Sequence, residues 1–167
     1  VGGAPMNQET ESFLMKIKFP ITIGYGMTEC APLISFTPDN EFKAGSCGRF
    51  LKGLLEVRID SEDPQRVAGE ILVRGEHVMK GYYKNDKDTH KVLDEEGWLH
   101  TGDMGYLTDD GFLYVLGRFK SLLIASDGEK YSPEGMEEAI ADASQLIDQI
   151  IVHNNQNPYT VAIVVPN

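Results

Sequence analysis

The stretch GYLTDDGFLYVLG, residues 105–117, carries the strongest fold signal in this chain. Two apolar, aromatic runs flank Asp110-Gly111, a dipeptide typical of a tight turn between antiparallel strands. The stretch therefore predicts a β-hairpin. Across the 167 residues, 17 Gly and 8 Pro are spread without any low-complexity block, which favours many short strands and turns over a helical bundle.

Segments before the hairpin extend this β-rich pattern. LLEVRID, residues 54–60, and GEILVRG, residues 69–75, predict two strands separated by a turn-rich segment. NDKDTHKVLDEEG, residues 85–97, predicts a short surface helix that ends at Gly97.

A helix is also predicted near the start of the chain, at residues 6–17. Asn7 is available as its N-cap. Its apolar side chains fall close to one helical face: Met6, Phe13, Leu14 and Ile17.

The pattern changes near residue 119, where the polar, basic segment GRFKS predicts a connector between two domains. Beyond it, Ser132 can cap a helix and Pro133 suits the first turn of that helix. Strands are expected at residues 149–154 and 160–165, so the tail predicts the order strand, helix, strand, strand.

Composition excludes several classes of protein. The chain is 41% hydrophobic and 25% charged, as globular domains are, and its net charge of -11 argues against a broad nucleic-acid surface. Cys30 and Cys47 lack the spacing of a zinc site or a disulfide framework, which favours a reducing, cytoplasmic compartment. The apolar runs fall short of the roughly 20 residues of a spanning helix, so no transmembrane segment is predicted.

Candidate ligand-binding groups follow a β-rich run in ITIGYGMTECAP, residues 21–32. Glu29 has the carboxylate oxygens that Mg²⁺ prefers, Thr28 offers a hydroxyl to a phosphate, and Tyr25 offers a flat face to a base. Taken alone, this stretch is more simply explained as an exposed polar turn at the end of a strand.

Two more candidates lie in WLHTGDMG and LGRFK. Asp103 could accept bonds from both hydroxyls of a ribose, although an Asx turn explains it as well. Arg118 could bind phosphate or ribose oxygens through its planar guanidinium, or it could be a solvated surface arginine.

Six motifs occur in one order along the chain: GGAP, YGMTE, GEILVRGEHVMKGYYKN, WLHTGD, GRFK and SDGEKYSPEGMEEAI. Together they resemble the adenylate-forming superfamily of acyl-CoA synthetases, firefly luciferase and peptide-synthetase adenylation domains, and the last motif is most similar to long-chain fatty acid-CoA ligases. The resemblance covers essentially the whole chain. It implies an α+β, β-rich fold, with a distorted β-barrel-like subdomain followed by part of a small α+β C-terminal domain.

The resemblance also implies a division of the chain. Residues 1–119 would form the end of the large adenylation domain, including its β-rich subdomain. Residues 120–167 would form the first part of a mobile C-terminal domain, with Lys120 at the hinge and Gly128 in the loop lining the pantetheine tunnel. A plain linker lysine and a tight turn remain open as explanations of these two residues.

The nucleotide site implied by the resemblance begins with small residues. Gly2, Gly3 and Ala4 would form the backbone wall beside adenine, and Tyr25 would cover the ring, with Gly26 in the same turn.

The remaining implied roles concern phosphate, metal and ribose. Thr28 and Glu29 would be the catalytic pair, with Thr28 contacting ATP phosphate and Glu29 holding Mg²⁺. Asp103 would take the ribose hydroxyls, and Arg118 would reach the ribose or phosphate.

The reaction implied by the resemblance has two steps. A carboxylate attacks the α-phosphorus of ATP to give an acyl-adenylate and pyrophosphate, and the thiol of coenzyme A then displaces AMP. The expected partners are ATP or AMP, a fatty acid and coenzyme A, with Mg²⁺ as cofactor. An amino acid or aryl acid activating enzyme, and a non-catalytic binding domain on the same scaffold, remain alternatives.

Two features of the superfamily are not found in this sequence. Its phosphate-binding loop, which ends in Pro-Lys-Gly, would precede the adenine motif, and no Lys or Arg follows Lys130 where the catalytic lysine is expected. We therefore expect an internal piece of a larger ligase that is inactive alone. Surfaces exposed by truncation make self-association plausible.

Overall fold

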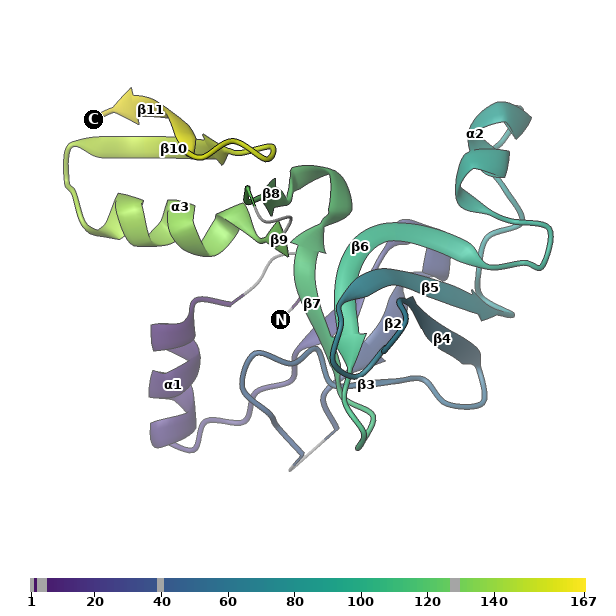
Figure 1. Ribbon diagram of the computed structural model, residues 1–167. Helices are drawn as coiled ribbons and strands as arrows, with labels where there is room; N and C mark the ends of the chain where they lie inside the picture. The colour runs from purple at the N-terminus through teal and green to yellow at the C-terminus, as the bar shows by residue number, and fades with distance from the viewer. Residues whose placement is uncertain (1, 3–5, 39–40, 127–129) are drawn as a thin grey trace. The chain divides into compact units, whose positions relative to one another are not determined.

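The computed structural model describes residues 2, 6–38, 41–126 and 130–167, and the chain forms two compact units (Figure 1). The first is Val1–Val115 and the second is Leu116–Asn167. Strands dominate both units, and the predicted α+β, β-rich class is confirmed. No helix among the described residues is long and apolar enough to cross a membrane.

A four-stranded sheet in the order β4-β5-β6-β7 is the largest sheet described. The predicted strands at 54–60 and 69–75 are confirmed as β4 and β5, which pair antiparallel, and β5 pairs antiparallel with β6. The predicted hairpin is also confirmed, because β6 and β7 flank the turn at Asp110-Gly111. The bounds are β4 Leu55–Asp60, β5 Gly69–Gly75, β6 Leu99–Leu107 and β7 Leu113–Arg118.

A smaller sheet of three strands, in the order β1-β2-β3, lies in the same unit. A bridge between Arg49 of β3 and Phe112 links it to the start of β7. In the part of the chain that the structure describes, the expected barrel-like subdomain is therefore two linked open sheets, which do not close into a barrel. The bounds are β1 Gly24–Gly26, β2 Leu33–Phe36 and β3 Arg49–Phe50.

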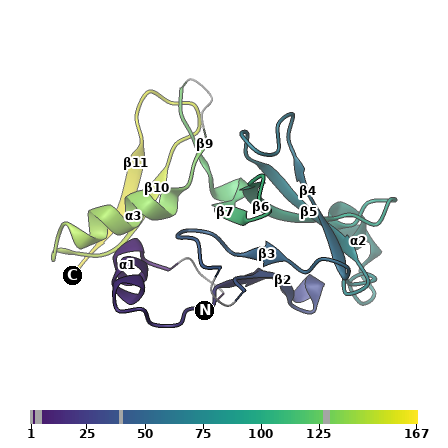
Figure 2. The ribbon, with the colours of Figure 1, turned by 90° about the horizontal axis from the view of Figure 1, so that it is seen from below.

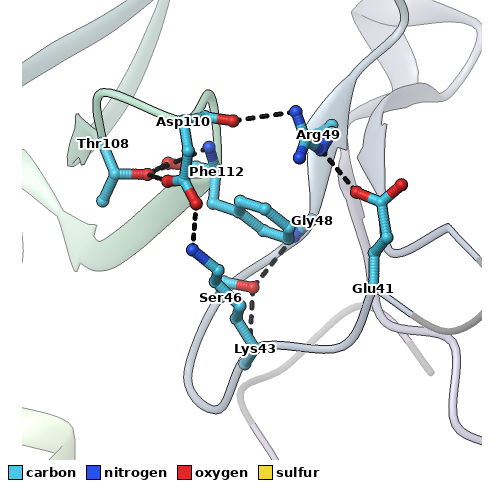
Figure 3. Close-up of polar contacts among 8 residues, drawn as sticks. All are labelled: Glu41, Lys43, Ser46, Gly48, Arg49, Thr108, Asp110 and Phe112. Atoms are coloured by element: carbon cyan, nitrogen blue, oxygen red, sulfur yellow. Dashed lines mark hydrogen bonds and ion pairs between the residues drawn. The ribbon is translucent and has the colours of Figure 1, made fainter.

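Phe112 is held between two cations where the two sheets meet (Figure 3). The Lys43 ammonium and the Arg49 guanidinium lie 4.4 and 4.6 Å from the centroid of its ring. Both cations also bind Asp110 of the hairpin turn: Lys43 forms an ion pair with its carboxylate, and Arg49 donates to its carbonyl at 2.8 Å. Thr108 closes the turn by donating to the Asp110 carboxylate at 2.7 Å. These contacts tie the β6–β7 hairpin to β3.

The core of the first unit is formed by apolar side chains from both sheets. Burying such side chains is the main favourable contribution to folding. The core residues with no exposed surface are Cys30, Ile34, Ile71, Val73, Leu99 and Leu113.

Helix α1, Gln8–Lys16, confirms the helix predicted near the start of the chain. The Asn7 side chain caps it by accepting from the N–H groups of Glu9 and Thr10, at 2.9 and 3.1 Å. Its apolar face is not buried, since Phe13 and Ile17 are 59% and 54% exposed. The buried residue is Glu11, whose carboxylate accepts the Gly45 N–H at 3.0 Å.

Helix α2, Asp86–Val92, is shorter than predicted, and the expectation that it reaches Gly97 is wrong. Leu93 adopts an extended conformation and forms a bridge to Leu99 at the start of β6. This strand-like pairing ends the helix five residues early.

In the second unit, α3 lies alongside β10, and the Glu137 carboxylate accepts the Val152 N–H at 2.9 Å (Figure 2). Strands β10 and β11 pair antiparallel, and Pro133 begins α3 as predicted. Ser132 occupies the N-cap, but its side chain makes no capping hydrogen bond, so that part of the prediction is wrong. The bounds are β8 Leu123–Ile124, β9 Lys130–Tyr131, α3 Pro133–Asp142, β10 Ile147–His153 and β11 Val161–Pro166.

The Leu113→Ala substitution tests the core of the first unit. We expect it to lower the free energy of unfolding by about 3 kcal/mol, because Leu113 has no exposed surface and its removal leaves a cavity. Urea denaturation measures the loss. Leu54→Ala is the matched control, because Leu54 is 54% exposed, and equal losses for the two variants would contradict the assigned core.

Candidate functional site

The turn after β1 presents its polar residues because the backbone folds back tightly on itself. The Met27 N–H donates to the Pro32 carbonyl at 2.8 Å. Gly26 is required here, since a Cβ at this position would lie 2.0 Å from the Pro32 carbonyl oxygen. Between them, the short 3₁₀ helix Thr28–Cys30 leaves Thr28 exposed and buries Cys30. Burial, with a further contribution from the nearby Glu29 charge, raises the pKa of Cys30 to about 11.

Asp103 lies on a bulge of β6. Glu70 and Leu72 of β5 are two residues apart, but their partners in β6, Met104 and His100, are four residues apart. The extra residues include Gly102, whose φ of 72° is the left-handed conformation that glycine adopts without strain. Bulges of this kind redirect side chains and occur often beside active sites.

The structure brings Tyr25 and Asp103 together. The Tyr25 hydroxyl donates to Oδ2 of Asp103 at 2.7 Å, although 78 residues separate them in the sequence. Asp103 is 6% exposed. The residues expected to contact the base and the ribose are therefore neighbours across two sheets.

Glu29 has a partner that sequence reasoning missed. The Tyr82 hydroxyl donates to Oε1 of Glu29 at 2.8 Å, and this hydrogen bond, with burial and the Glu29 charge, raises the pKa of Tyr82. The Met79 N–H also donates to the Glu29 carbonyl, at 2.8 Å. Met79 and Tyr82 both lie in the motif GEILVRGEHVMKGYYKN, but the sequence alone indicates no role for either residue.

Helix α2 holds the backbone of Tyr82 in place. The Tyr82 N–H donates to Oγ1 of Thr89 at 2.9 Å, and that hydroxyl in turn donates to the Asn85 carbonyl at 2.9 Å. Gly81 has a φ of 145°, and a Cβ there would lie 2.9 Å from the Thr89 side chain. The first turn of α2 therefore sets the position from which Tyr82 reaches Glu29.

The other predicted site residues fall into three groups. Gly2 lies against β1, where an added Cβ would be 3.1 Å from the Gly24 carbonyl oxygen. Arg118 ends β7, and Lys120 lies in the 3₁₀ helix Phe119–Ser121 of the second unit. Outside the described residues lie Gly3, Ala4 and Gly128.

Glu29 provides one carboxylate for a metal ion. The described residues contain no group of three or more His, Cys, Asp or Glu side chains that could hold a metal by themselves. Mg²⁺ is often bound by one or two carboxylates together with the phosphates of a substrate and water. Glu29, with one oxygen engaged by Tyr82 and its side chain partly exposed, fits a magnesium ion that arrives with a nucleotide.

Comparison with known proteins finds related sequences throughout the chain. Residues 1–83 match the family described as AMP-binding enzyme, and residues 120–167 match the AMP-binding enzyme C-terminal domain. The long-chain-fatty-acid–CoA ligase ACSBG1 of Rattus norvegicus is 37% identical over 159 residues, covering 95% of this chain and 22% of the relative. The probable 4-coumarate–CoA ligase 3 of Dictyostelium discoideum is 36% identical over 158 residues, covering 90% of this chain and 28% of the relative. The chain thus spans roughly a quarter of the length of these relatives.

Solved structures of ligases share the fold. The o-succinylbenzoate CoA synthetase of Bacillus subtilis, in complex with the acyl-adenylate intermediate OSB-AMP, superposes with a TM-score of 0.83 at 31% identity, covering 99% of this chain and 35% of that chain. The same enzyme in complex with ATP and magnesium ion gives a TM-score of 0.80 at 32% identity over the same shares.

These matches agree with the resemblance that the order of motifs indicates. The chain belongs to the AMP-binding enzyme family of adenylate-forming acid-CoA ligases.

Proposed function

We propose that the protein carrying this chain is an AMP-forming acid-CoA ligase, and that this chain supplies the ribose and metal corner of its nucleotide site. The observation that carries the proposal is the 2.7 Å hydrogen bond from Tyr25 to Asp103. Ribose hydroxyls are donors of the same kind as the Tyr25 hydroxyl. The buried Asp103 carboxylate already accepts one hydroxyl, so it is also suited to accept the hydroxyls of a ribose.

The roles of the chain's residues follow from this arrangement. The Tyr25 ring covers adenine, Asp103 orients the ribose, and the exposed Thr28 hydroxyl donates to a phosphate oxygen. Mg²⁺ held by Glu29 would neutralise phosphate charge, which dominates catalysis of phosphoryl transfer. Arg118 adds a cation for ribose or phosphate.

The remaining assignments concern the C-terminal part of the chain. We propose that a mobile domain begins near residue 119, with Lys120 at its hinge and Gly128 beside the pantetheine of coenzyme A. The match of residues 120–167 to a separate C-terminal domain family supports this division. We also propose a cytoplasmic location, on the basis of cysteine usage.

A long-chain fatty acid is the proposed acid substrate. Support comes from the 37% identity to the rat long-chain-fatty-acid–CoA ligase and from several similar relatives of that name. An aryl acid is the second candidate, because 4-coumarate–CoA ligases match at 34% to 36% identity. Thioester formation by the whole gene product across fatty and aryl acids distinguishes the two.

The Asp103→Asn substitution tests the ribose contact in the gene product that contains this chain. We expect ATP binding to weaken about 10- to 100-fold, because a hydrogen bond to a charged group contributes about 1.5–3 kcal/mol. Isothermal titration calorimetry measures the dissociation constant. Asp109→Asn is the control, since Asp109 is exposed in the same hairpin, and unchanged ATP affinity in Asp103→Asn would contradict the role.

The Tyr82→Phe substitution tests the support of Glu29. It removes the hydroxyl that donates to Glu29, and we expect the Mg²⁺ concentration that half-saturates ATP binding to rise about fivefold, from the loss of about 1 kcal/mol. Magnesium titration at fixed ATP measures this. Tyr83→Phe is the matched control, because Tyr83 is 87% exposed. The same magnesium dependence in both variants would show that Tyr82 does not act on the metal site.

The 167-residue chain alone is proposed to be inactive. Without a cation in the position of the catalytic lysine, one preorganised charge contact is lost, which commonly costs about 3 kcal/mol or more. We expect no pyrophosphate release with ATP, Mg²⁺ and a fatty acid in a coupled assay. Release above the rate without protein would refute this expectation.

A further inference from the structure

We propose that Glu70 is a positioning residue for nucleotide binding, which sets the orientation of Asp103 by holding the β6 bulge. This inference rests on the proposed function, because it concerns how Asp103 is aimed at a ribose. Glu70 contacts neither the proposed metal ligand nor the base-covering residue in any hydrogen bond that the structure shows.

The carboxylate of Glu70 contacts the residues before and after Thr101. Its Oε1 accepts the Gly102 N–H at 2.9 Å, and its Oε2 lies 2.9 Å from Nδ1 of His100. The Glu70 side chain is 23% exposed, so both contacts are partly shielded from water. One side chain of β5 therefore contacts both His100 and Gly102 of β6.

The bulge needs such a partner because it interrupts the ladder between the strands. Extra residues in one strand have no opposite backbone group with which to pair. A backbone N–H without a partner costs free energy when it is shielded from water. Glu70 provides the acceptor that the Gly102 N–H would otherwise lack from the ladder.

Thr101 completes the replacement of ladder bonds. Its hydroxyl donates to the Ile71 carbonyl at 2.7 Å and accepts the Asp103 N–H at 3.1 Å. Glu70 and Ile71 are consecutive in β5, so the strand holds the bulge through a side chain and a carbonyl side by side. These two contacts between β5 and the bulge set the position of the Asp103 backbone, which comes next in the chain.

The acceptor oxygen of Glu70 and the length of its side chain matter more to this arrangement than its charge does. Glutamine keeps a carbonyl oxygen for the Gly102 N–H, whereas alanine removes the acceptor. Aspartate keeps the charge but is one methylene shorter, so it cannot hold the bulge with the same geometry. The Gln variant should therefore retain most of the effect, and the Ala and Asp variants should lose it.

The test compares ATP with 2′,3′-dideoxy-ATP, which lacks both ribose hydroxyls, in the gene product that contains this chain. The ratio of their dissociation constants measures the contact between Asp103 and the ribose hydroxyls. We expect Glu70→Ala to weaken ATP binding about tenfold while changing 2′,3′-dideoxy-ATP binding little, so that the ratio falls toward one. A residue with only a structural role would weaken both nucleotides equally.

Further variants complete the design. Glu56→Ala is the matched control, because it removes a carboxylate from neighbouring β4 that binds Arg74 and makes no hydrogen bond to the bulge in the structure. The double variant Asp103→Ala/Glu70→Ala should bind ATP no more weakly than Asp103→Ala alone, since the effects of residues that act through one contact are not additive. If Glu70→Ala does not fold, the contrast between Glu70→Gln and Glu70→Asp gives the same information.

Each outcome supports or overturns a particular claim. A falling ratio in Glu70→Ala or Glu70→Asp, with the ratio retained in Glu70→Gln and Glu56→Ala, supports the inference. An unchanged ratio, or equal weakening of both nucleotides, overturns it while leaving the ribose site intact. Failure of the unaltered protein to prefer ATP over 2′,3′-dideoxy-ATP overturns the proposed ribose site, and the inference with it.

Discussion

The bulge in β6 is the constraint on which the candidate site depends. Extra residues between His100 and Met104 interrupt the ladder with β5, and side chains then replace the missing ladder bonds. The displaced backbone carries Asp103 to the Tyr25 hydroxyl of the other sheet. A regular strand would alternate its side chains between two faces, and Asp103 would be placed by that alternation alone.

The two open sheets hold the site residues, which lie in β1, on the bulge of β6 and in the turn after β1. The hairpin is tied to β3 through Phe112 and its two flanking cations, so the sheet that carries Asp103 is held to the sheet that carries Tyr25 (Figure 3). Binding residues commonly lie on loops that a packed scaffold positions. Glu29 is also positioned by packed structure, because α2 holds the backbone of Tyr82, whose hydroxyl donates to Glu29.

Much of the fold could be predicted because its signals are local. Alternating apolar residues predicted β4 and β5, and Asp110-Gly111 predicted the hairpin. Two differences arose where a contact outside the helix overrode a local preference. Helix α2 stops early because Leu93 pairs with Leu99. In α1, Phe13 and Ile17 are exposed, whereas Glu11 is buried and accepts the Gly45 N–H.

The family, the order of its motifs and the types of residue available for nucleotide and metal can all be inferred from the amino-acid sequence alone. These follow from short stretches in which spacing and residue type suffice. Which residues become partners depends instead on how the chain folds: Tyr25 pairs with Asp103, Tyr82 with Glu29, and Glu70 with the bulge. Those pairs lie 78, 53 and 32 residues apart, and strand register and the packing of α2 bring them within hydrogen-bonding distance.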